Sequence, residues 1–175
     1  MRGKKGIPHN DPQDPPRRRA NKVRGHGTWE TDRPAVQGIV SRETGVVRFI
    51  VVQDSSRASL EPNVLAYTPA GAVINTDEWR AYNNLSQMDR IHMTVCHTPG
   101  KRVWAKDVDG DGIREVHNNT IEGTWTGTRN FLRLFRGVNK IYLQQYLAIH
   151  EWACKLKTVT LYFLRILCGV TRLPT

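Results

Sequence analysis

Hydrophobic and polar positions alternate in two stretches near the start of the folded body. Ala35 to Val40 and Val46 to Gln53 are rich in β-branched residues, and the turn-forming run Arg42-Glu43-Thr44-Gly45 separates them. Two such runs joined by a short polar turn are typical of a β-hairpin. The pattern therefore predicts a pair of antiparallel strands where the body opens, near Pro34.

Helical and extended patterns alternate over the next forty residues. Ser56 to Tyr67 carries apolar residues at helical spacing, although Pro62 weakens the middle of that helix. Ala72 to Ile74 and Ile91 to Cys96 have the composition of short strands, and Thr76 to Tyr82 is typical of a short helix. This alternation favours a sheet with helices packed on it.

The last third of the chain is expected to be helical. A polar, Gly- and Asp-rich connection over residues 98–117 leads to a long helix that begins near Asn119 and runs to a break at Gly137. Further helices are expected at Asn139–Lys157 and Tyr162–Leu167. The stripe expected to pack on the core consists of Tyr142, Tyr146, Ile149, Ala153 and Leu156, with Leu143 and Leu147 alongside. The element order predicts a mixed α/β fold.

Composition narrows the class of protein. The chain has 175 residues, 39% of them hydrophobic and five of them Trp, which suits one folded domain. Its formal net charge of +10 favours a polyanionic partner, with nucleic acid first and an anionic membrane surface second. A soluble basic protein without such a partner is the plain alternative.

The basic charge is concentrated at the N-terminus. Residues 1–24 contain eight Lys or Arg against two Asp, and four of the nine prolines. We expect residues 1–33 to form a basic, proline-rich arm and residues 34–175 to form the body. The candidate DNA-binding residues of the arm are Arg17, Arg18, Arg19, Lys22 and Arg24. They contact phosphates in one interpretation and belong to a solvated loop in the other.

Cysteine usage and the apolar stretches indicate the compartment. Cys96, Cys154 and Cys168 are odd in number and widely spaced, which fits the reducing cytoplasm. Leu161 to Val170 is too short to span a membrane and contains Arg165. The chain is therefore expected to be cytoplasmic, with no signal peptide and no membrane partner.

Two carboxylates occupy positions where chemistry is expected. Asp77 follows a short strand, and ligands of α/β sheets gather at the carboxyl ends of strands. Glu122 lies 45 positions later, in the first turn of the long helix. Both have a structural alternative, because Asp77 can cap a helix that starts at Glu78, and Glu122 can form a capping box with Asn119.

Two segments around these acids resemble a known family. Thr76-Asp77-Glu78-Trp79-Arg80-Ala81-Tyr82 and His117-Asn118-Asn119-Thr120-Ile121-Glu122-Gly123-Thr124-Trp125 are similar to signature segments of insertion-sequence transposases of the ISXO-like type. The basic segments Arg17 to Lys22 and Arg24 to Thr28 are also similar to that family. The likeness covers nearly the whole chain.

The resemblance implies a fold and an activity. Such transposases have a ribonuclease H-like catalytic domain in which three acidic residues hold two Mg²⁺ or Mn²⁺ ions for attack on a DNA phosphodiester. By the match, Asp77 is the second acid and Glu122 the third, and both bind metal. His117 and Asn119 are supporting residues near them. The partners implied are transposon ends and target DNA, and the intact transposase is expected to be an oligomer.

The first acid of the family pattern has no counterpart here. Asp11, Asp14 and Asp32 lie in polar, proline-flanked contexts and none follows a strand. We therefore interpret the chain as N-terminally truncated and lacking the first strand of its sheet. Three expectations follow: a gapped or rearranged sheet, weak metal binding, and strand transfer that is absent or very feeble.

Arg129, Arg133 and Arg136 recur at helical spacing and form one face. This face is a candidate DNA-binding surface, and an ordinary solvated helix face is the alternative.

Two alternatives to catalysis stay open. One is a non-catalytic nucleic-acid-binding remnant. The other is a calcium-binding or interaction module over residues 107–118, where Asp107, Asp109, Asp111 and Gly112 open an EF-hand-like loop whose twelfth position is Asn118 instead of a bidentate Glu. His92, Cys96 and His97 are expected to be structural, because two ligands on one face make a poor zinc site.

Overall fold

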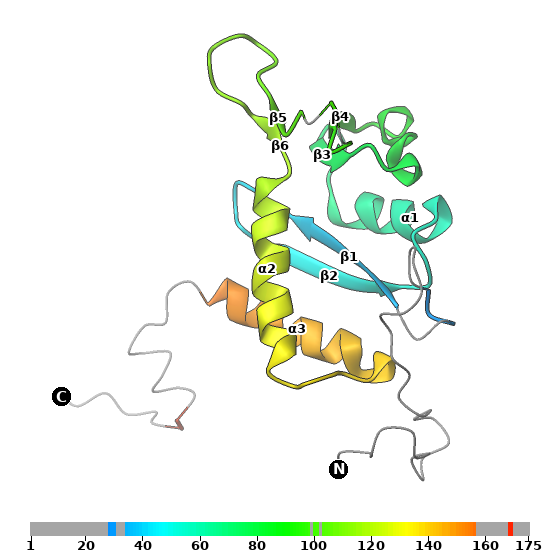
Figure 1. Cartoon of the computed structure of the whole chain (residues 1–175), viewed down its shortest axis with the longest axis vertical. Helices are drawn as coiled ribbons and strands as arrows, with labels where there is room; N and C mark the ends of the chain where they lie inside the picture. Colours follow the sequence, from blue (N-terminus) through cyan, green and yellow to red (C-terminus); the bar gives the residue numbers. More distant parts are fainter. Residues whose placement is uncertain (1–27, 31–33, 99, 102, 157–167, 170–175) are drawn as a thin grey trace, which may run out of the picture.

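We describe the chain from a computed structural model, over residues 28–30, 34–98, 100–101, 103–156 and 168–169. Over these residues the fold is mixed α/β, with three two-stranded sheets and the helices α1, α2 and α3 (Figure 1). The predicted fold class is confirmed at this level. The basic segments of the arm and the helix expected at Tyr162–Leu167 lie outside the described residues. None of the described helices is long and apolar enough to cross a membrane.

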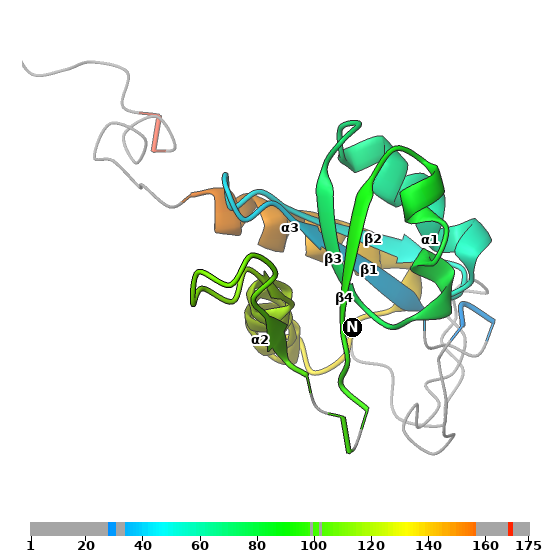
Figure 2. The same ribbon diagram turned by 90° about the horizontal axis from the view of Figure 1, so that it is seen from above.

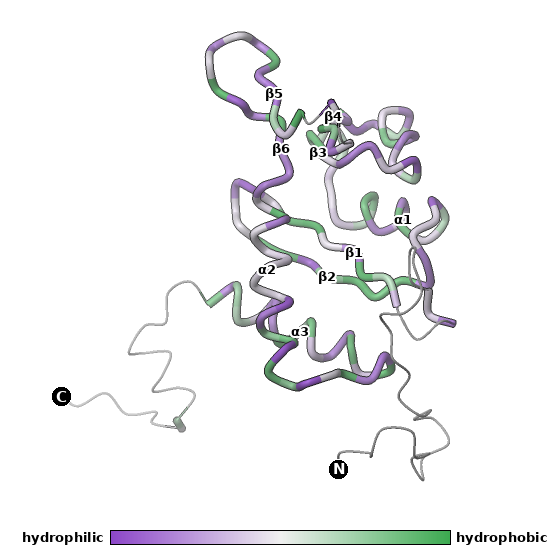
Figure 3. Tube along the Cα trace, in the orientation of Figure 1, coloured by the Kyte–Doolittle hydropathy of each residue, from purple (hydrophilic) through white to green (hydrophobic). Residues whose placement is uncertain are grey.

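The predicted hairpin is present. β1 (Ala35–Val40) pairs antiparallel with β2 (Val47–Val52), in a register that sets Ala35 opposite Val52 and Val40 opposite Val47. Because successive side chains of a strand point to opposite faces, the β-branched runs supply apolar residues to both sides of this sheet (Figure 3). The hairpin therefore lies between two helical layers.

One face of the hairpin packs against α1 (Arg57–Tyr67). Val52 and Leu60 form a buried cluster with Ala81, and the amide of Gln37 donates to the carbonyl of Leu60 at 3.0 Å. The helix predicted here is confirmed, and Pro62 lies inside it.

The other face packs against α2 (Asn119–Arg133) and α3 (Leu143–Lys155) (Figures 1 and 2). Val47, Phe49 and Leu147 are buried at this contact, and the rings of Phe49 and Trp125 lie 5.1 Å apart between centroids. Phe49 is therefore the centre of the main core, and Trp125 packs on the sheet as part of the same cluster.

The stripe predicted for α3 is right at Leu147 and Leu143, which pack on the core, and wrong at other positions. Ile149 and Tyr142 are exposed, whereas Leu147 and Glu151, four residues apart, are buried. The carboxylate of Glu151 accepts from the main-chain N–H of Phe49, and the amide of Gln144 bonds both the carbonyl of Phe49 and the N–H of Val51. Polar side chains of α3 thus cover the outer edge of β2, and this pairing, not hydrophobicity alone, sets which face of α3 is buried.

A second sheet contains β3 (Val73–Asp77) and β4 (Ile91–Val95), which lie side by side and parallel (Figure 2). β3 is longer than predicted, because Thr76 and Asp77 extend the strand and do not start a helix. The helix expected over Thr76–Tyr82 is reduced to a 3₁₀ turn at Arg80–Tyr82, and a second 3₁₀ turn follows at Leu85–Gln87.

The polar connection contains a hairpin that the sequence did not predict. β5 (Ala105–Lys106) pairs antiparallel with β6 (Val116–His117), and the loop between them projects from the body (Figure 1). Each strand has only two residues, so no alternation was available to reveal it. β6 leads directly into α2, which places the start of that helix beside the second sheet.

The three sheets stay separate over the described residues. β1 bonds only β2, and β3 bonds only β4, so each of these pairs keeps one edge that faces the other pair across a cavity. That the two pairs belong to one ribonuclease H-like sheet is a proposal, taken up below.

Candidate functional site

Asp77 is the last residue of β3 and is exposed. Its Oδ1 accepts from the main-chain N–H of Trp79 at 3.2 Å, which is a local turn bond. The alternative role as a cap of a helix starting at Glu78 is wrong, because the following 3₁₀ turn begins at Arg80. Trp79 occupies the N-cap position of that turn. The carboxylate of Asp77 therefore lies at the carboxyl end of a strand, and its second oxygen takes no part in that hydrogen bond.

Glu122 lies in the first turn of α2, with its side chain 51% exposed. The predicted capping box with Asn119 is wrong. Asn118 occupies the N-cap position and its side chain makes no capping hydrogen bond, while Asn119 is the first residue of the helix. The Nδ1 atom of His97 lies 3.8 Å from Oε1 of Glu122.

The two acids lie at the same end of the second sheet. Asp77 is in register with Val95 of β4, and His97, which approaches Glu122, follows Val95 by two residues. His97 also packs its ring on Trp104, with centroids 4.6 Å apart. The sequence predicted only a structural role for His97, so its place beside Glu122 was missed. The available signal was its position just beyond the end of a strand.

A cavity of about 310 Å³ reaches from the end of β3 to the first turns of α2. Asp77 lines it together with Asn118, Ile121 and Trp125. A second cavity of about 420 Å³ adjoins it, since the two share residues of β1, β3 and α2, and it extends to His117. Asp77 and His117 therefore line adjoining cavities, and Glu122 lines neither of them.

His117 ends β6 and is half-buried. Its Nδ1 is buried without a hydrogen-bond partner among the described residues, and its carbonyl accepts from the guanidinium of Arg42. Burial, together with the positive charge of Arg42, lowers the pKa of His117 below its usual value. The imidazole therefore stays neutral at pH 7. Asn119, the other supporting residue, is exposed.

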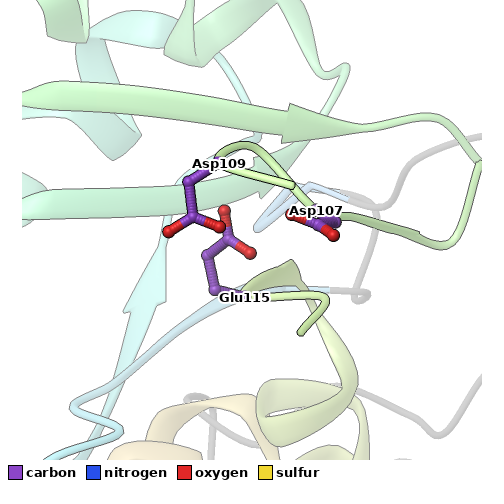
Figure 4. A group of neighbouring side chains, drawn as sticks. All are labelled: Asp107, Asp109 and Glu115. Carbon is purple, nitrogen blue, oxygen red and sulfur yellow. The ribbon is translucent and has the colours of Figure 1, made fainter. Parts of the chain in front are cut away.

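A separate acidic cluster lies in the β5–β6 loop (Figure 4). Over the described residues, Asp107, Asp109 and Glu115 are the one group of three or more possible metal ligands, with ligand atoms within 4.8 Å of one another. The Asp107 carboxylate accepts from the N–H groups of Gly110 and Gly112, which lowers its pKa, and Glu115 accepts from the N–H of Val108. Hydrogen bonds within the loop therefore already hold these carboxylates, and a calcium site here stays a hypothesis.

The three possible metal ligands on β4 and just after it, His92, Cys96 and His97, make separate contacts. His92 Nε2 lies 2.8 Å from Thr76 Oγ1, whereas Cys96 is buried and its N–H donates to the carbonyl of Val103. His97 approaches Glu122 and packs on Trp104, so the three side chains have different partners.

The candidate basic face of α2 forms a surface hollow. Arg129, Arg133 and Arg136 line it together, next to Leu143 of α3. The helix ends at Arg133 and not at Arg136, which has a positive φ of 52° just before Gly137. The break predicted at Gly137 is therefore nearly right. The other candidate DNA-binding residues, from Arg17 to Arg24, lie outside the described residues.

Comparison with known proteins identifies the family. No curated protein and no solved structure gives a significant match. A family model described as the ISXO2-like transposase domain matches residues 8–154, which is most of the chain and includes Asp77, Glu122 and all the strands. The chain therefore belongs to the family of ISXO2-like transposase domains.

Proposed function

We propose that this chain is part of the catalytic domain of an insertion-sequence transposase, which cleaves DNA phosphodiesters and transfers strands with the help of a divalent metal. The observation that carries the proposal is the position of Asp77 and Glu122 at one end of the β3–β4 pair, together with the family match. Both acids are exposed, and neither side chain caps a helix, so neither is accounted for by burial or capping.

The donor set fits Mg²⁺ or Mn²⁺. Both side chains offer exposed carboxylate oxygens, which are the ligands that hard cations prefer. When bound, such an ion lowers the pKa of an attacking water or hydroxyl and stabilises charge on the leaving oxygen. Asp77 and Glu122 hold the cation in this proposal, and neutral His117 lines the adjoining cavity, where its unpartnered Nδ1 can bond a phosphate oxygen or a hydroxyl.

Two carboxylates bind a pair of divalent metal ions weakly. We therefore also propose that a third acid comes from polypeptide outside residues 34–156. This proposal includes the ribonuclease H-like sheet, because it treats β1–β2 and β3–β4 as two parts of one sheet with a strand missing between them. The cavity between the two pairs supports that view.

Metal binding provides the first test. In a titration of the full chain with Mn²⁺, we expect the backbone NMR signals near Asp77 and Glu122 to broaden together, at millimolar concentrations. Asp77→Asn and Glu122→Gln should each reduce the broadening at both places, because one ion contacts both acids. Asp107→Asn is the matched control and should leave it unchanged. Broadening confined to residues 107–115 would instead favour the calcium-binding module.

DNA chemistry provides the second test. We expect the chain of residues 1–175 to bind transposon-end DNA but to join it to a target very poorly in Mg²⁺ or Mn²⁺, because two acids bind metal weakly. Restoration of joining by an added polypeptide that carries the third acid would support the catalytic proposal. Unchanged joining in the Asp77→Asn and Glu122→Gln variants under those conditions would favour a non-catalytic DNA-binding remnant.

A further inference from the structure

The loop between β5 and β6 is acidic, although the chain as a whole is basic. Residues 107–115, which we call the acidic loop, contain four acidic side chains against one arginine, whereas the formal net charge of the chain is +10. The loop projects from the body, so these charges stand apart from the basic surface (Figure 1). Copies of a protein with a net charge of one sign repel each other, and a projecting segment of the other sign is where they can attract.

The acidic loop also carries apolar side chains. Val108 is 57% exposed and Ile113 is 66% exposed, and both lie between carboxylates of the loop. Removing such side chains from water on contact with another molecule is favourable. The loop therefore offers a combination of negative charge and apolar surface, which a purely solvated turn does not require.

Local hydrogen bonds hold the acidic loop in one conformation. The carboxylate of Asp107 accepts from the N–H groups of Gly110 and Gly112, and the carboxylate of Asp111 accepts from the N–H of Ile113. A loop that is already ordered loses less conformational freedom when it binds a partner. These bonds leave the negative charges in place.

A surface hollow with the opposite charge lies at the far end of α2. Its volume is about 480 Å³, and we call it the arginine hollow. Three arginines and three large apolar side chains line it: Arg129, Arg133, Arg136, Leu132, Val138 and Leu143. A phosphate group matches only the arginines, whereas the acidic loop matches the arginines with its carboxylates and the apolar lining with Val108 and Ile113.

The loop and the hollow of one copy cannot meet. The acidic loop precedes the first residue of α2, and the arginine hollow is formed around its last turn. A helix of 15 residues is about 22 Å long. The loop also projects away from the helix, so the two surfaces lie at opposite ends of the molecule (Figure 1). A second copy of the chain supplies the loop that this hollow fits.

We propose that the acidic loop of one copy docks in the arginine hollow of a second copy. A two-fold arrangement lets each loop enter the hollow of the other copy, so two equal contacts form and the assembly closes as a dimer. The same arginines are the candidate phosphate contacts, and a docked loop therefore keeps DNA away from them. The proposal goes beyond the function proposed above and requires neither metal nor DNA.

Sedimentation equilibrium of the full chain, without metal or DNA, provides the test. We expect a monomer–dimer equilibrium whose Kd increases with salt, because salt screens the charges across the contact. Asp109→Asn with Asp111→Asn should raise Kd about tenfold, because two charges are lost from the contact. Each asparagine retains the Oδ1 atom that accepts the local turn bond, so the loop keeps its conformation.

Two further sets of variants locate the contact. Glu43→Gln with Glu78→Gln removes the same charge from other exposed positions and should change Kd less. Arg129→Gln with Arg133→Gln should raise Kd about as much as the loop variant does. When the loop and arginine substitutions are combined, the loss should be well below the product of the two separate losses, because each removes the same interaction.

Other outcomes overturn the proposal. A chain that stays monomeric up to millimolar concentration does not associate in this way. Equal weakening by the loop variant and by Glu43→Gln with Glu78→Gln, or multiplicative losses in the combined variant, would show that the loop and the hollow are not in contact. Assemblies that grow beyond a dimer would contradict the two-fold arrangement. None of these results bears on Asp77 and Glu122, whose Mn²⁺ titration tests the catalytic proposal separately.

Discussion

Glu151 is a buried acid with a structural purpose. Its carboxylate accepts from the N–H of Phe49, and its second oxygen lies 3.0 Å from the guanidinium of Arg48. The main-chain N–H of Phe49 would otherwise lack a partner, because Phe49 is only 1% exposed and lies inside the core. This bond therefore links α3 to β2 beside the apolar contacts of Leu147.

Removing that acceptor should destabilise the fold. We expect Glu151→Ala to lower the free energy of unfolding by about 2–3 kcal/mol, because the Phe49 N–H is left unsatisfied and a charge-assisted bond is lost. Glu151→Gln retains an acceptor oxygen and should lose less. Urea denaturation measures both, with Glu43→Ala in the exposed hairpin turn as a control within about 0.5 kcal/mol of the parent. Equal losses for the Ala and Gln variants would contradict the role of the acceptor.

Between elements, β1 and α2 approach each other closely at Gly38. A Cβ atom added to Gly38 would lie 2.8 Å from Cζ2 of Trp125 and 3.0 Å from Cδ1 of Ile121. Glycine at this position lets the helix approach the sheet, so the indole of Trp125 can reach the ring of Phe49. No such neighbour surrounds Gly123 on α2 itself, where an added Cβ would meet nothing within 4 Å.

Alanine substitution at the two glycines should therefore have opposite effects. We expect Gly38→Ala to cost about 1–3 kcal/mol, since it forces α2 away from the sheet. Gly123→Ala should stabilise by about 0.5–1 kcal/mol, because alanine loses less backbone freedom than glycine inside a helix. Thermal or urea unfolding of the two variants gives the comparison. A loss at Gly123 similar to that at Gly38 would show that the contact with Trp125 is unimportant.

Elements with a clear period were predictable from the sequence. The strands of the β1–β2 hairpin and the helix α1 each contain an apolar pattern that predicts them. The predicted bounds agree with the observed ones to within a residue or two. The buried face of α3 was not predictable, because a glutamate and a glutamine on that face bond the edge of β2. Local hydrophobicity carries no information about such long-range polar pairing.

The candidate site was predictable in identity but not in geometry. Asp77 and Glu122 could be selected because their segments resemble a family, whereas position alone left capping as an equal explanation. His97 was missed, since its approach to Glu122 depends on how β4 lies against the start of α2. The two-residue strands β5 and β6, which set that arrangement, are too short to produce a pattern.

At the scale of the whole molecule, a basic chain carries one arginine-lined hollow on its described surface. The net charge is +10, and Arg129, Arg133 and Arg136 line a common hollow at the end of α2. If this hollow contacts DNA phosphates, binding must weaken with salt in proportion to the number of contacts.

Replacement of these three arginines by alanine should change that salt dependence. We expect the slope of log Kobs against log salt concentration to become shallower by about two to three, because three phosphate contacts are lost. Fluorescence anisotropy on duplex DNA measures the slope. A triple variant of the exposed Arg57, Arg114 and Lys155 removes the same charge elsewhere and should change it less. Similar slopes for the two variants would indicate a solvated helix face.

Three histidines make stability depend on pH. Burial lowers the pKa values of His92, His117 and His150 below 6.5, so the folded chain binds fewer protons than the unfolded chain once the pH falls below that value. Stability is therefore fully present above pH 6.5 and is lost as the pH falls toward the folded-state pKa values. Asp107 and Asp54 act only at lower pH, since their pKa values lie below 3.8.

We expect the free energy of unfolding to be constant from pH 8 to pH 7 and to decrease from pH 6.5 to pH 5. His150, whose ring is stacked on Phe131 with centroids 5.0 Å apart, should contribute part of this decrease. His150→Gln removes its titration, and urea unfolding at each pH should then give a shallower dependence. Stability that rises as the pH is lowered from 6.5 would contradict the assignment.

The side chains of Gln144 and Glu151 have a further consequence for how copies of this chain can associate. An unprotected hairpin is a template that can stack indefinitely, since each added strand exposes a new edge. Here the far side of β2 is already occupied by α3, so a hairpin can recruit a neighbour on one flank only. Open-ended polymerisation through this hairpin stops after a single addition, and the protein keeps a reactive flank without the hazard of fibre growth.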